Sequence, residues 1–400
     1  MTMLDAQLRT VAERLAALPE EKQLTFPQQL REKGVSLERL PITRQPCERA
    51  PLSPAQSRLW FLWQMEPHSA AYNIPAALRL RGTLDTEALR QAFEALVARH
   101  ETLRTLFREE GGEPLQVILP TLPLAMLEED LSSLPSDRRE DAAHERLEQL
   151  ARQPFDLANG PLLRLHLLRL SDSEHLLLFN LHHIVSDGWS MGVMVQELMQ
   201  LYAAYSQGQD CQLGTLPIQY ADYALWQRRW MEAGEKERQL GYWREQLGGS
   251  QPVLELPLDH PRPAVQSYRG ARQDVALEPA LVAGLKALAQ REGVTLFMLL
   301  LASFQTLLYR YSGQSDIRVG VPTANRNRAE TERLIGFFVN TQILKADIDG
   351  QMTFRELIPD FTLSQSRSNL ALWAMTVVDS SSGLMGPRSL PMARRSRDQM

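Results

Sequence analysis

Two adjacent histidines, followed closely by an acid and a glycine, are the residues of this chain best suited to chemistry. His182 and His183 end an apolar run, and Asp187 and Gly188 come shortly after them. An imidazole titrates near neutral pH, so His183 could accept a proton from an amine or a hydroxyl group. Gly188 allows the main chain to approach a substrate closely. The pattern predicts a general base displayed on a loop.

The elements on either side must place these residues where a strand breaks into that loop. Residues 174–181 are almost entirely apolar and predict a strand buried on both faces. Residues 189–205 carry apolar side chains at helical spacing and predict a helix. Neighbouring side chains on a strand point to opposite faces, so His182 and His183 cannot both enter one cavity. We therefore expect one imidazole in a reaction channel and the other packed in its wall.

Simpler interpretations of the two histidines stay open on the residues alone. A histidine in a strand can be a satisfied core residue. A zinc site would need a third ligand, and none recurs at helical or Cys-x-x-Cys spacing. A nucleophilic triad would use Ser186 or Ser190, but neither lies in a Gly-x-Ser-x-Gly turn. No metal site is predicted.

Periodicity elsewhere predicts an alternation of helices and strands. The predicted helices are 84–100, 137–152, 221–247, 280–291 and 296–311. The predicted strands are 161–170, which should pair with the histidine strand, and 316–321. Gly111 and Gly112 predict a hairpin turn between residues 105–107 and 115–119. The aromatic side chains of residues 220–243 are interpreted as helix-packing residues.

Composition limits the class of protein. With 400 residues, 44% of them hydrophobic and 23% charged, the chain is typical of a large globular protein of one or two domains. A formal net charge of -5 argues against a nucleic-acid binder. The first residues lack the basic and apolar regions of a signal peptide, and the apolar stretch 296–309 is too short to span a bilayer. Cys47 and Cys211 form no metal or redox motif, which favours a reducing, cytoplasmic compartment.

Five segments of the chain together resemble the condensation domains of non-ribosomal peptide synthetases. More distantly they resemble the His-x-x-x-Asp acyltransferases that include chloramphenicol acetyltransferase. The segments follow one another in the family's order and are residues 52–62, 99–107, 182–190, 220–226 and 335–342. The likeness covers roughly residues 50–358. Five ordered matches are far more specific than the histidine motif alone.

The resemblance implies a mixed α/β fold, of the two-layer α+β kind. Two chloramphenicol acetyltransferase-like lobes would form a V around a central channel. The expected parts are an N-terminal linker or extension (1–50), a first lobe with the histidine motif (51–215), a partial second lobe (216–358) and a tail (359–400). The tail lacks the family's closing segments and has no helix or strand period, so we expect it to be disordered and the second lobe to be C-terminally truncated.

The resemblance also implies amide bond formation during the synthesis of a secondary metabolite such as a siderophore or lipopeptide. A donor acyl or peptidyl thioester and an aminoacyl acceptor would arrive on the phosphopantetheine arms of two carrier proteins. The adenylation domain of the same synthetase is a further expected partner, and no cofactor is expected to be bound covalently. His183, beside His182, would hold or accept the proton of the amine. The Gly188 amide would face the oxyanion, and Asp187 would position the loop.

Two further sets of residues follow from the resemblance. Trp189, Ser190 and Asn340 are expected to line the substrate channel, although Asn340 could equally be a turn residue after a strand. Asp187 is expected to pair with an arginine, because a buried carboxylate without a partner is costly. The candidates are Arg58, Arg99, Arg104 and Arg326. The sequence does not choose among them.

Two other functions remain open at this point. The chain could be an inactive truncated remnant, or a module that docks carrier proteins without turnover. It could also be a stand-alone acyltransferase that uses a soluble acyl thioester such as coenzyme A.

Overall fold

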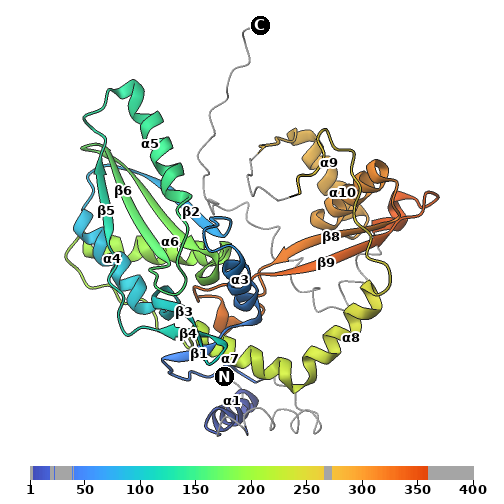
Figure 1. Ribbon diagram of the computed structural model, residues 1–400, viewed down its shortest axis with the longest axis horizontal. Helices are drawn as coiled ribbons and strands as arrows, with labels where there is room; N and C mark the ends of the chain where they lie inside the picture. Colours follow the sequence, from blue (N-terminus) through green and yellow to red (C-terminus); the bar gives the residue numbers. More distant parts are fainter. Residues whose placement is uncertain (1–2, 19–21, 23–37, 39, 265–272, 359–400) are drawn as a thin grey trace. The chain divides into compact units, whose positions relative to one another are not determined.

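A computed structural model describes residues 3–18, 22, 38, 40–264 and 273–358 (Figure 1). These residues fall into two compact units. The first unit holds the described residues up to Glu245 together with Ala324–Val339, and the second holds Gln246–Thr323 and the described residues from Asn340 onward. The boundary between the units therefore lies after Glu245 and not at the expected residue 215. The segment Ala324–Val339, distant in sequence, also belongs to the first unit. The expected tail, 359–400, lies outside the described residues.

A four-stranded sheet organises the first unit (Figure 1). Its strands, in spatial order, are β2 (Asn73–Arg81), β7 (Glu174–His182), β6 (Leu163–Ser171) and β5 (Met126–Asp130). The histidine strand β7 is central and pairs antiparallel with β2 and β6, and β5 pairs parallel with β6. The predicted pairing of the strand at 161–170 with the histidine strand is confirmed.

Helices cover both faces of this sheet. They are α4 (Thr86–Arg99), α5 (Ser136–Ala151) and α6 (Gly188–Tyr205). Phe179 and its odd-numbered neighbours on β7 belong to the core shared with α4 and α6, whereas Leu178 and its even-numbered neighbours belong to the core under α5. Because successive side chains of a strand alternate between faces, a strand covered on both sides is mostly apolar along its whole length. This arrangement explains the largely apolar run before the histidines, in which the buried Asn180 donates to the carbonyls of Leu150 and Ala151.

A smaller sheet and a capped helix complete the part of the first unit near the histidine loop. The sheet contains β1 (Arg49–Pro51), β4 (Glu113–Ile118) and β3 (Thr105–Glu110), in that order. The β3–β4 hairpin closes at Gly111 and Gly112, which have φ angles of 63° and 85°. The predicted hairpin is thereby confirmed. Helix α3 (Pro54–Met65) begins at a capping box formed by Ser53 and Gln56.

The helical character predicted for residues 221–247 is confirmed, but the segment is not one continuous helix. The segment forms α7 (Tyr220–Trp230) and α8 (Lys236–Leu247), separated by one turn of π-helix, Met231–Glu235. Gly234 has a φ angle of 96°, which lies in the left-handed region and interrupts the helical hydrogen bonds. A single glycine within an apolar periodic pattern was not enough to reveal the break. Helix α1 (Met3–Ala16) precedes all these elements.

The second unit packs two helices on one face of a two-stranded sheet. Its elements are α9 (Pro279–Arg291), α10 (Leu296–Ser312), β8 (Asp316–Thr323) and β9 (Asn340–Asp347). The strands are antiparallel, and their core is shared with α10 through residues such as Leu299, Ile317 and Leu344. The predicted helices and strand of this region are confirmed, as is the mixed α/β class.

None of the described helices is by itself long and apolar enough to cross a membrane. Helices α9 and α10 together have the length and apolar composition of a membrane span, but they are bent by 104° with respect to each other.

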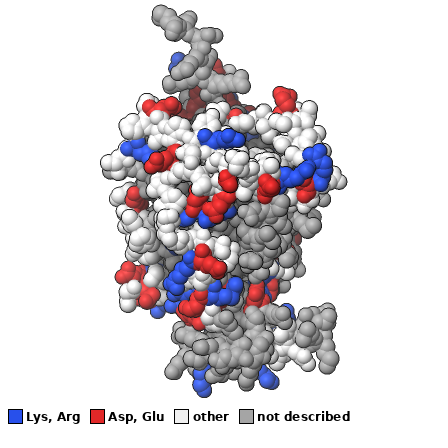
Figure 2. Space-filling model, turned by 90° about the vertical axis from the view of Figure 1, so that its right-hand side faces the viewer, with Lys and Arg blue, Asp and Glu red and all other residues white. Residues whose placement is uncertain are grey.

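Charged side chains are mixed on the face of the molecule shown in Figure 2, where acidic and basic groups alternate among uncharged residues. Many of the described surface charges are paired. Arg79, for example, contacts both Glu140 and Glu174. Such exposed pairs contribute little to stability, on the order of 0–1 kcal/mol each.

The central strand supplies a test of the fold. Phe179 is fully buried, and its ring lies 6.2 Å from that of Phe93 on α4. We expect Phe179→Ala to lower the free energy of unfolding by about 3–5 kcal/mol, because it leaves a cavity between β7 and α4. Leu127→Ala on β5, where the side chain is 58% exposed, is the matched control. Urea unfolding measures both, and an equal effect of the two substitutions would contradict the assigned core.

Candidate active site

His182 is the buried member of the histidine pair. It ends β7, is 3% exposed, and its Nδ1 accepts a hydrogen bond from the N–H of Ile184 at 3.1 Å. The rings of Tyr72 and Phe155 lie 6.3 and 6.1 Å from its own. Burial, with a smaller contribution from the neighbouring His183, lowers the pKa of His182 to about 3. The His182 imidazole is therefore neutral and belongs to the wall of the site.

His183 differs from its neighbour in exposure and in hydrogen bonding. It is partly exposed and opens the short 3-10 turn His183–Val185. Its Nδ1 lies 2.8 Å from the carbonyl oxygen of Ser186. A carbonyl can only accept, so Nδ1 carries the hydrogen and Nε2 of the neutral ring keeps its lone pair. The ring of Phe337 meets this imidazole edge-on at 4.8 Å. His183 can thus accept a proton at Nε2.

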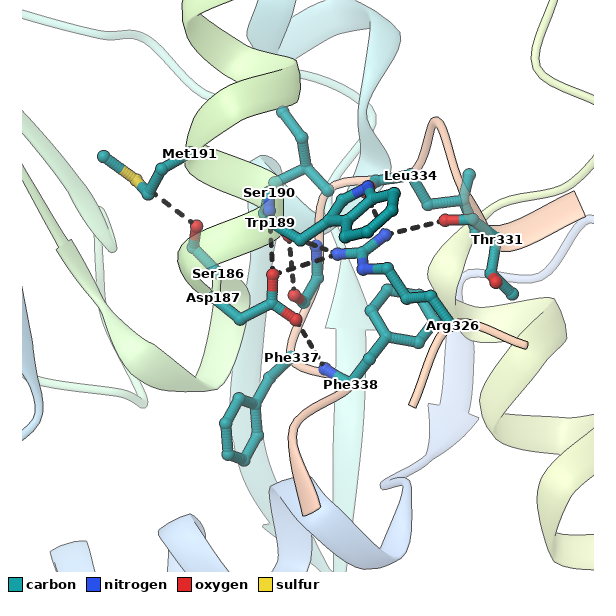
Figure 3. A network of polar contacts seen from close by, with 12 residues as sticks. Ser186, Asp187, Trp189, Ser190, Met191, Arg326, Thr331, Leu334, Phe337 and Phe338 are labelled. Carbon is teal, nitrogen blue, oxygen red and sulfur yellow. Dashed lines mark hydrogen bonds and ion pairs between the residues drawn. The ribbon is translucent and has the colours of Figure 1, made fainter. Parts of the chain in front are cut away.

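Asp187 is fully buried and accepts hydrogen bonds on both carboxylate oxygens (Figure 3). As the N-cap of α6 it accepts at Oδ1 from the N–H of Ser190 at 2.8 Å. The same oxygen lies 3.0 Å from Nη2 of Arg326, and Oδ2 accepts from the N–H of Phe338 at 3.0 Å. Asp187 therefore ties α6 to the segment that rejoins the first unit, and the Nδ1 of His183 is satisfied by Ser186 instead.

Arg326 is the candidate arginine that the structure brings to Asp187. Its guanidinium is buried and donates from Nη1 to the carbonyls of Thr331 and Leu334, at 2.6 and 2.8 Å. The ring of Phe338 lies 4.0 Å from its central carbon, which adds a cation–π contact. Burial lowers the pKa of Arg326 and Asp187 opposes this change, so the group stays charged.

The other candidate arginines have different partners. Arg58 donates to the carbonyl of Val339, Arg99 to the carboxylate of Glu197, and Arg104 to the carbonyl of Leu119. Glu197, on α6, is also 2.8 Å from Nε2 of the buried His100. These arginines connect elements around the site without reaching Asp187.

The residues expected to line a channel lie in different surroundings. Ser190 is fully buried, and its hydroxyl donates to the carbonyl of Gly336 at 2.9 Å while accepting from Arg326. That expectation is corrected for Ser190, because its hydroxyl is used inside the protein. Trp189 is 40% exposed and its Nε1 donates to the carbonyl of Glu332 at 2.8 Å. Asn340 lies in the second unit, where it opens β9.

Gly188 presents its main chain to solvent. It is exposed, it is the first residue of α6, and a Cβ atom added to it would meet nothing within 4 Å. The first N–H groups of a helix are not used by the helix's own hydrogen bonds. The Gly188 N–H is one of these groups, and helix N-termini favour anionic partners.

Residues 336–338 contact His183, Ser190 and Asp187, and sequence reasoning did not identify this packing. Tyr220, interpreted as a helix-packing residue, donates its hydroxyl proton to the carbonyl of Phe337. Its ring lies so close to Gly336 that a Cβ there would be 2.1 Å from Cδ2. Within the histidine turn, the carbonyl of Ile184 accepts a hydrogen bond from the Gln56 side chain at 3.3 Å. These residues all lie in the five family-like segments, which was the available signal.

The described residues contain no group of three or more His, Cys, Asp and Glu side chains that could hold a metal ion.

Two glycines of the site should respond in opposite ways to an added methyl group. Gly336→Ala would drive a Cβ into the buried Tyr220 ring, and we expect it to lower the free energy of unfolding by about 2–3 kcal/mol. Gly188→Ala has open space and a helical position, so its stability should stay equal or rise slightly. Urea unfolding measures both. A fully stable Gly336→Ala variant would show that the 336–338 segment does not pack as described.

The low pKa of His182 predicts a loss of stability in mild acid. The unfolded chain takes up a proton near pH 6.5, whereas the folded chain does so only near pH 3, so stability falls as the pH drops below about 6.5. At pH 5.5 this residue should cost about 1.4 kcal/mol relative to pH 8. His182→Asn keeps an acceptor for Ile184 and should reduce the loss between these pH values by about that amount. Identical pH profiles for both proteins would contradict the assignment.

Comparison with known proteins identifies the family of this chain. The model of the family described as "Condensation domain" matches residues 47–369. A linear gramicidin synthase of Brevibacillus parabrevis is 51% identical over 319 residues, which are 80% of this chain and 4% of that protein. Chondramide synthase of Chondromyces crocatus is 48% identical over 308 residues, which are 77% of this chain and 8% of that protein. The chain spans 4–8% of the length of the first four curated relatives.

Solved structures share the fold. The X-domain solved in complex with OxyB from teicoplanin biosynthesis has a TM-score of 0.73 and 30% identity, and the match covers 82% of this chain and 72% of that one. Holo-AB3403, a four-domain nonribosomal peptide synthetase bound to AMP and glycine, has a TM-score of 0.72 and 25% identity, with 82% and 24% covered. The chain therefore belongs to the condensation-domain family of non-ribosomal peptide synthetases, as its five ordered segments predicted.

Proposed function

We propose that this chain forms an amide bond between a carrier-bound acyl or peptidyl thioester and a carrier-bound aminoacyl group. The observation that carries the proposal is the state of His183. Its Nδ1 is occupied by the Ser186 carbonyl, its Nε2 keeps a lone pair, and its ring is partly exposed. The family membership of the chain supplies the reaction class.

The proposed step needs little covalent help from the protein, because a thioester is already activated. The acceptor amine attacks the thioester carbonyl, the C–N bond forms, and the C–S bond breaks as the tetrahedral intermediate collapses. Nε2 of His183 holds or accepts the proton of the amine and returns it to the departing thiolate. The amide of Gly188 donates to the oxygen that becomes negative. Orientation of two tethered substrates supplies most of the acceleration.

The buried groups of the site have supporting roles in this proposal. Asp187 and Arg326 hold the loop and contact no solvent, so they act by position. His182 stays neutral and carries no proton in the reaction at neutral pH. Trp189 offers an exposed indole next to Gly188 and is the described side chain of α6 that we propose to contact substrate.

We further propose that the partners are donor and acceptor carrier proteins and an adenylation domain of one synthetase. Support comes from the four-domain synthetase among the structural neighbours, of which the match covers 24%. In this proposal the carriers bring the phosphopantetheine arms, and the chain binds no cofactor covalently. Cys47 and Cys211 are both free thiols, which supports a reducing, cytoplasmic location.

A docking module without turnover is a second candidate. One observation favours it: the X-domain with the same fold was solved in complex with another protein, OxyB. A domain of this architecture can therefore bind a further protein. The test below separates the two candidates.

The test combines the purified chain with a donor-loaded carrier and an aminoacyl-loaded carrier, and it measures dipeptidyl-carrier by intact mass. We expect product with the unchanged chain and a loss of about 100-fold or more in His183→Ala, because general acid–base catalysis contributes that much. His175→Asn is the control, since this histidine lies on the same strand β7 but at its other end.

The other outcomes of this assay distinguish the alternative functions. Undiminished product in His183→Ala would overturn the assigned role of this imidazole. Carrier binding without product from any variant would favour the docking module. Product formed from a free acyl-coenzyme A and a soluble amine, and not from carriers, would indicate a stand-alone acyltransferase.

A further inference from the structure

The hydroxyl of Tyr220 links two segments that lie far apart in the sequence. Tyr220 is 1% exposed and is the first residue of α7. Its hydroxyl donates to the carbonyl of Phe337 and lies 2.8 Å from Oγ of Ser53. A phenol has one proton and a carbonyl can only accept, so the hydroxyl of Ser53 must donate to Tyr220. The result is a directed chain from Ser53 through Tyr220 to Phe337.

The ring of Tyr220 is fitted to the same segment as its hydroxyl. A side chain at Gly336 would collide with it, and the ring of Phe338 meets it edge-on at 4.9 Å. The neighbours of Phe337 are held separately, because the hydroxyl of Ser190 accepts from the N–H of Gly336, and Asp187 accepts from the N–H of Phe338. Within residues 336–338, Tyr220 therefore holds one main-chain group, the carbonyl of Phe337.

Phe337 is the residue through which this chain of hydrogen bonds reaches His183. Its side chain is 7% exposed, and its ring lies 4.8 Å from the imidazole at an interplanar angle of 65°. The hydrogen bond from Nδ1 to the Ser186 carbonyl holds the imidazole at one atom only. A contact on the ring face or edge further restricts rotation of the ring plane and hence the direction of Nε2. Phe337 supplies that contact.

The Ser53 end of this hydrogen-bond chain also supports the histidine turn, through Gln56. Ser53 caps α3 and accepts from the N–H of Gln56 at 3.1 Å. The side chain of Gln56 in turn donates to the carbonyl of Ile184, the residue after His183. One helix N-terminus therefore supports the histidine turn directly through Gln56 and supports Phe337 through Tyr220.

We propose that Tyr220 is a positioning residue, whose hydroxyl holds Phe337 so that the Phe337 ring directs Nε2 of His183 toward the reacting amine. This inference rests on the proposed function of His183, but its geometric part can be tested without turnover. Burial raises the pKa of Tyr220 well above its usual range, so the phenol keeps the proton it donates at all working pH values.

The test compares Tyr220→Phe, which removes only the hydroxyl, with Tyr223→Phe. Tyr223 is the matched control because it lies on the same helix, is buried, and packs on Phe338 at 4.7 Å. Its hydroxyl contacts Asn325 at 3.4 Å and not the Phe337 carbonyl. Nitrogen-15 NMR of the histidine side chains, with His183 assigned by the His183→Ala spectrum, reports the surroundings of this imidazole, and steady-state assays report kcat and KM.

In Tyr220→Phe we expect shifted His183 ring resonances and a kcat lower by about tenfold, with KM for the acceptor carrier changed by less than about twofold. Tyr223→Phe should change neither. Phe337→Leu should reproduce the NMR shift, and Tyr220→Phe added to it should have no further effect on His183. If Tyr220→Phe does not fold, Phe337→Leu alone tests whether the Phe337 ring orients His183.

Failure of the positioning role and failure of the proposed function give different results. His183 resonances and kcat that match the Tyr223→Phe control would overturn the positioning role, and so would an unchanged His183 signal in Phe337→Leu. Shifted resonances in a protein that makes no amide under any condition would support the positioning role and overturn the proposed function instead.

Discussion

The buried ion pair between Asp187 and Arg326 is the interaction on which the rest of the site depends. Both side chains are fully buried, and they come from positions 139 residues apart. Removing one partner of such a pair leaves an uncompensated charge and typically costs about 3–5 kcal/mol. The carboxylate also accepts from Ser190 and Phe338, and the guanidinium donates to two carbonyls. Satisfying these charges therefore fixes the histidine loop, the start of α6 and residues 336–338 together.

Two identical side chains in adjacent positions acquire different properties because a strand ends between them. His182 takes the last position of β7, where burial lowers its pKa to about 3. His183 takes the first position of the following turn, where its ring is partly exposed and one nitrogen meets a carbonyl. One imidazole thus contributes packing and the other contributes a lone pair. The exposed main chain of Gly188, shortly after the turn, adds a donor on the same loop.

Much of the fold could be predicted because its signals are local. The apolar run that became β7, the helical spacing of α6 and the glycines of the β3–β4 hairpin each reflect the surroundings of consecutive residues. The break between α7 and α8 was missed because Gly234 is one residue within an otherwise regular pattern. Ser190 was misplaced for another reason: its position at a helix start indicates exposure, whereas its hydroxyl is used by Gly336 and Arg326.

By itself the sequence determined the family and the strand–loop–helix that carries the histidines, since both rest on residue types at short spacing. The tertiary structure alone decided which arginine meets Asp187, which histidine is buried, and that Tyr220 and Gly336 fit together beside Phe337. The physical reason is the range of the interactions. Spacing along a strand or helix is fixed by backbone geometry, but an ion pair, a desolvated imidazole and a ring packed on a glycine depend on segments that only folding brings together.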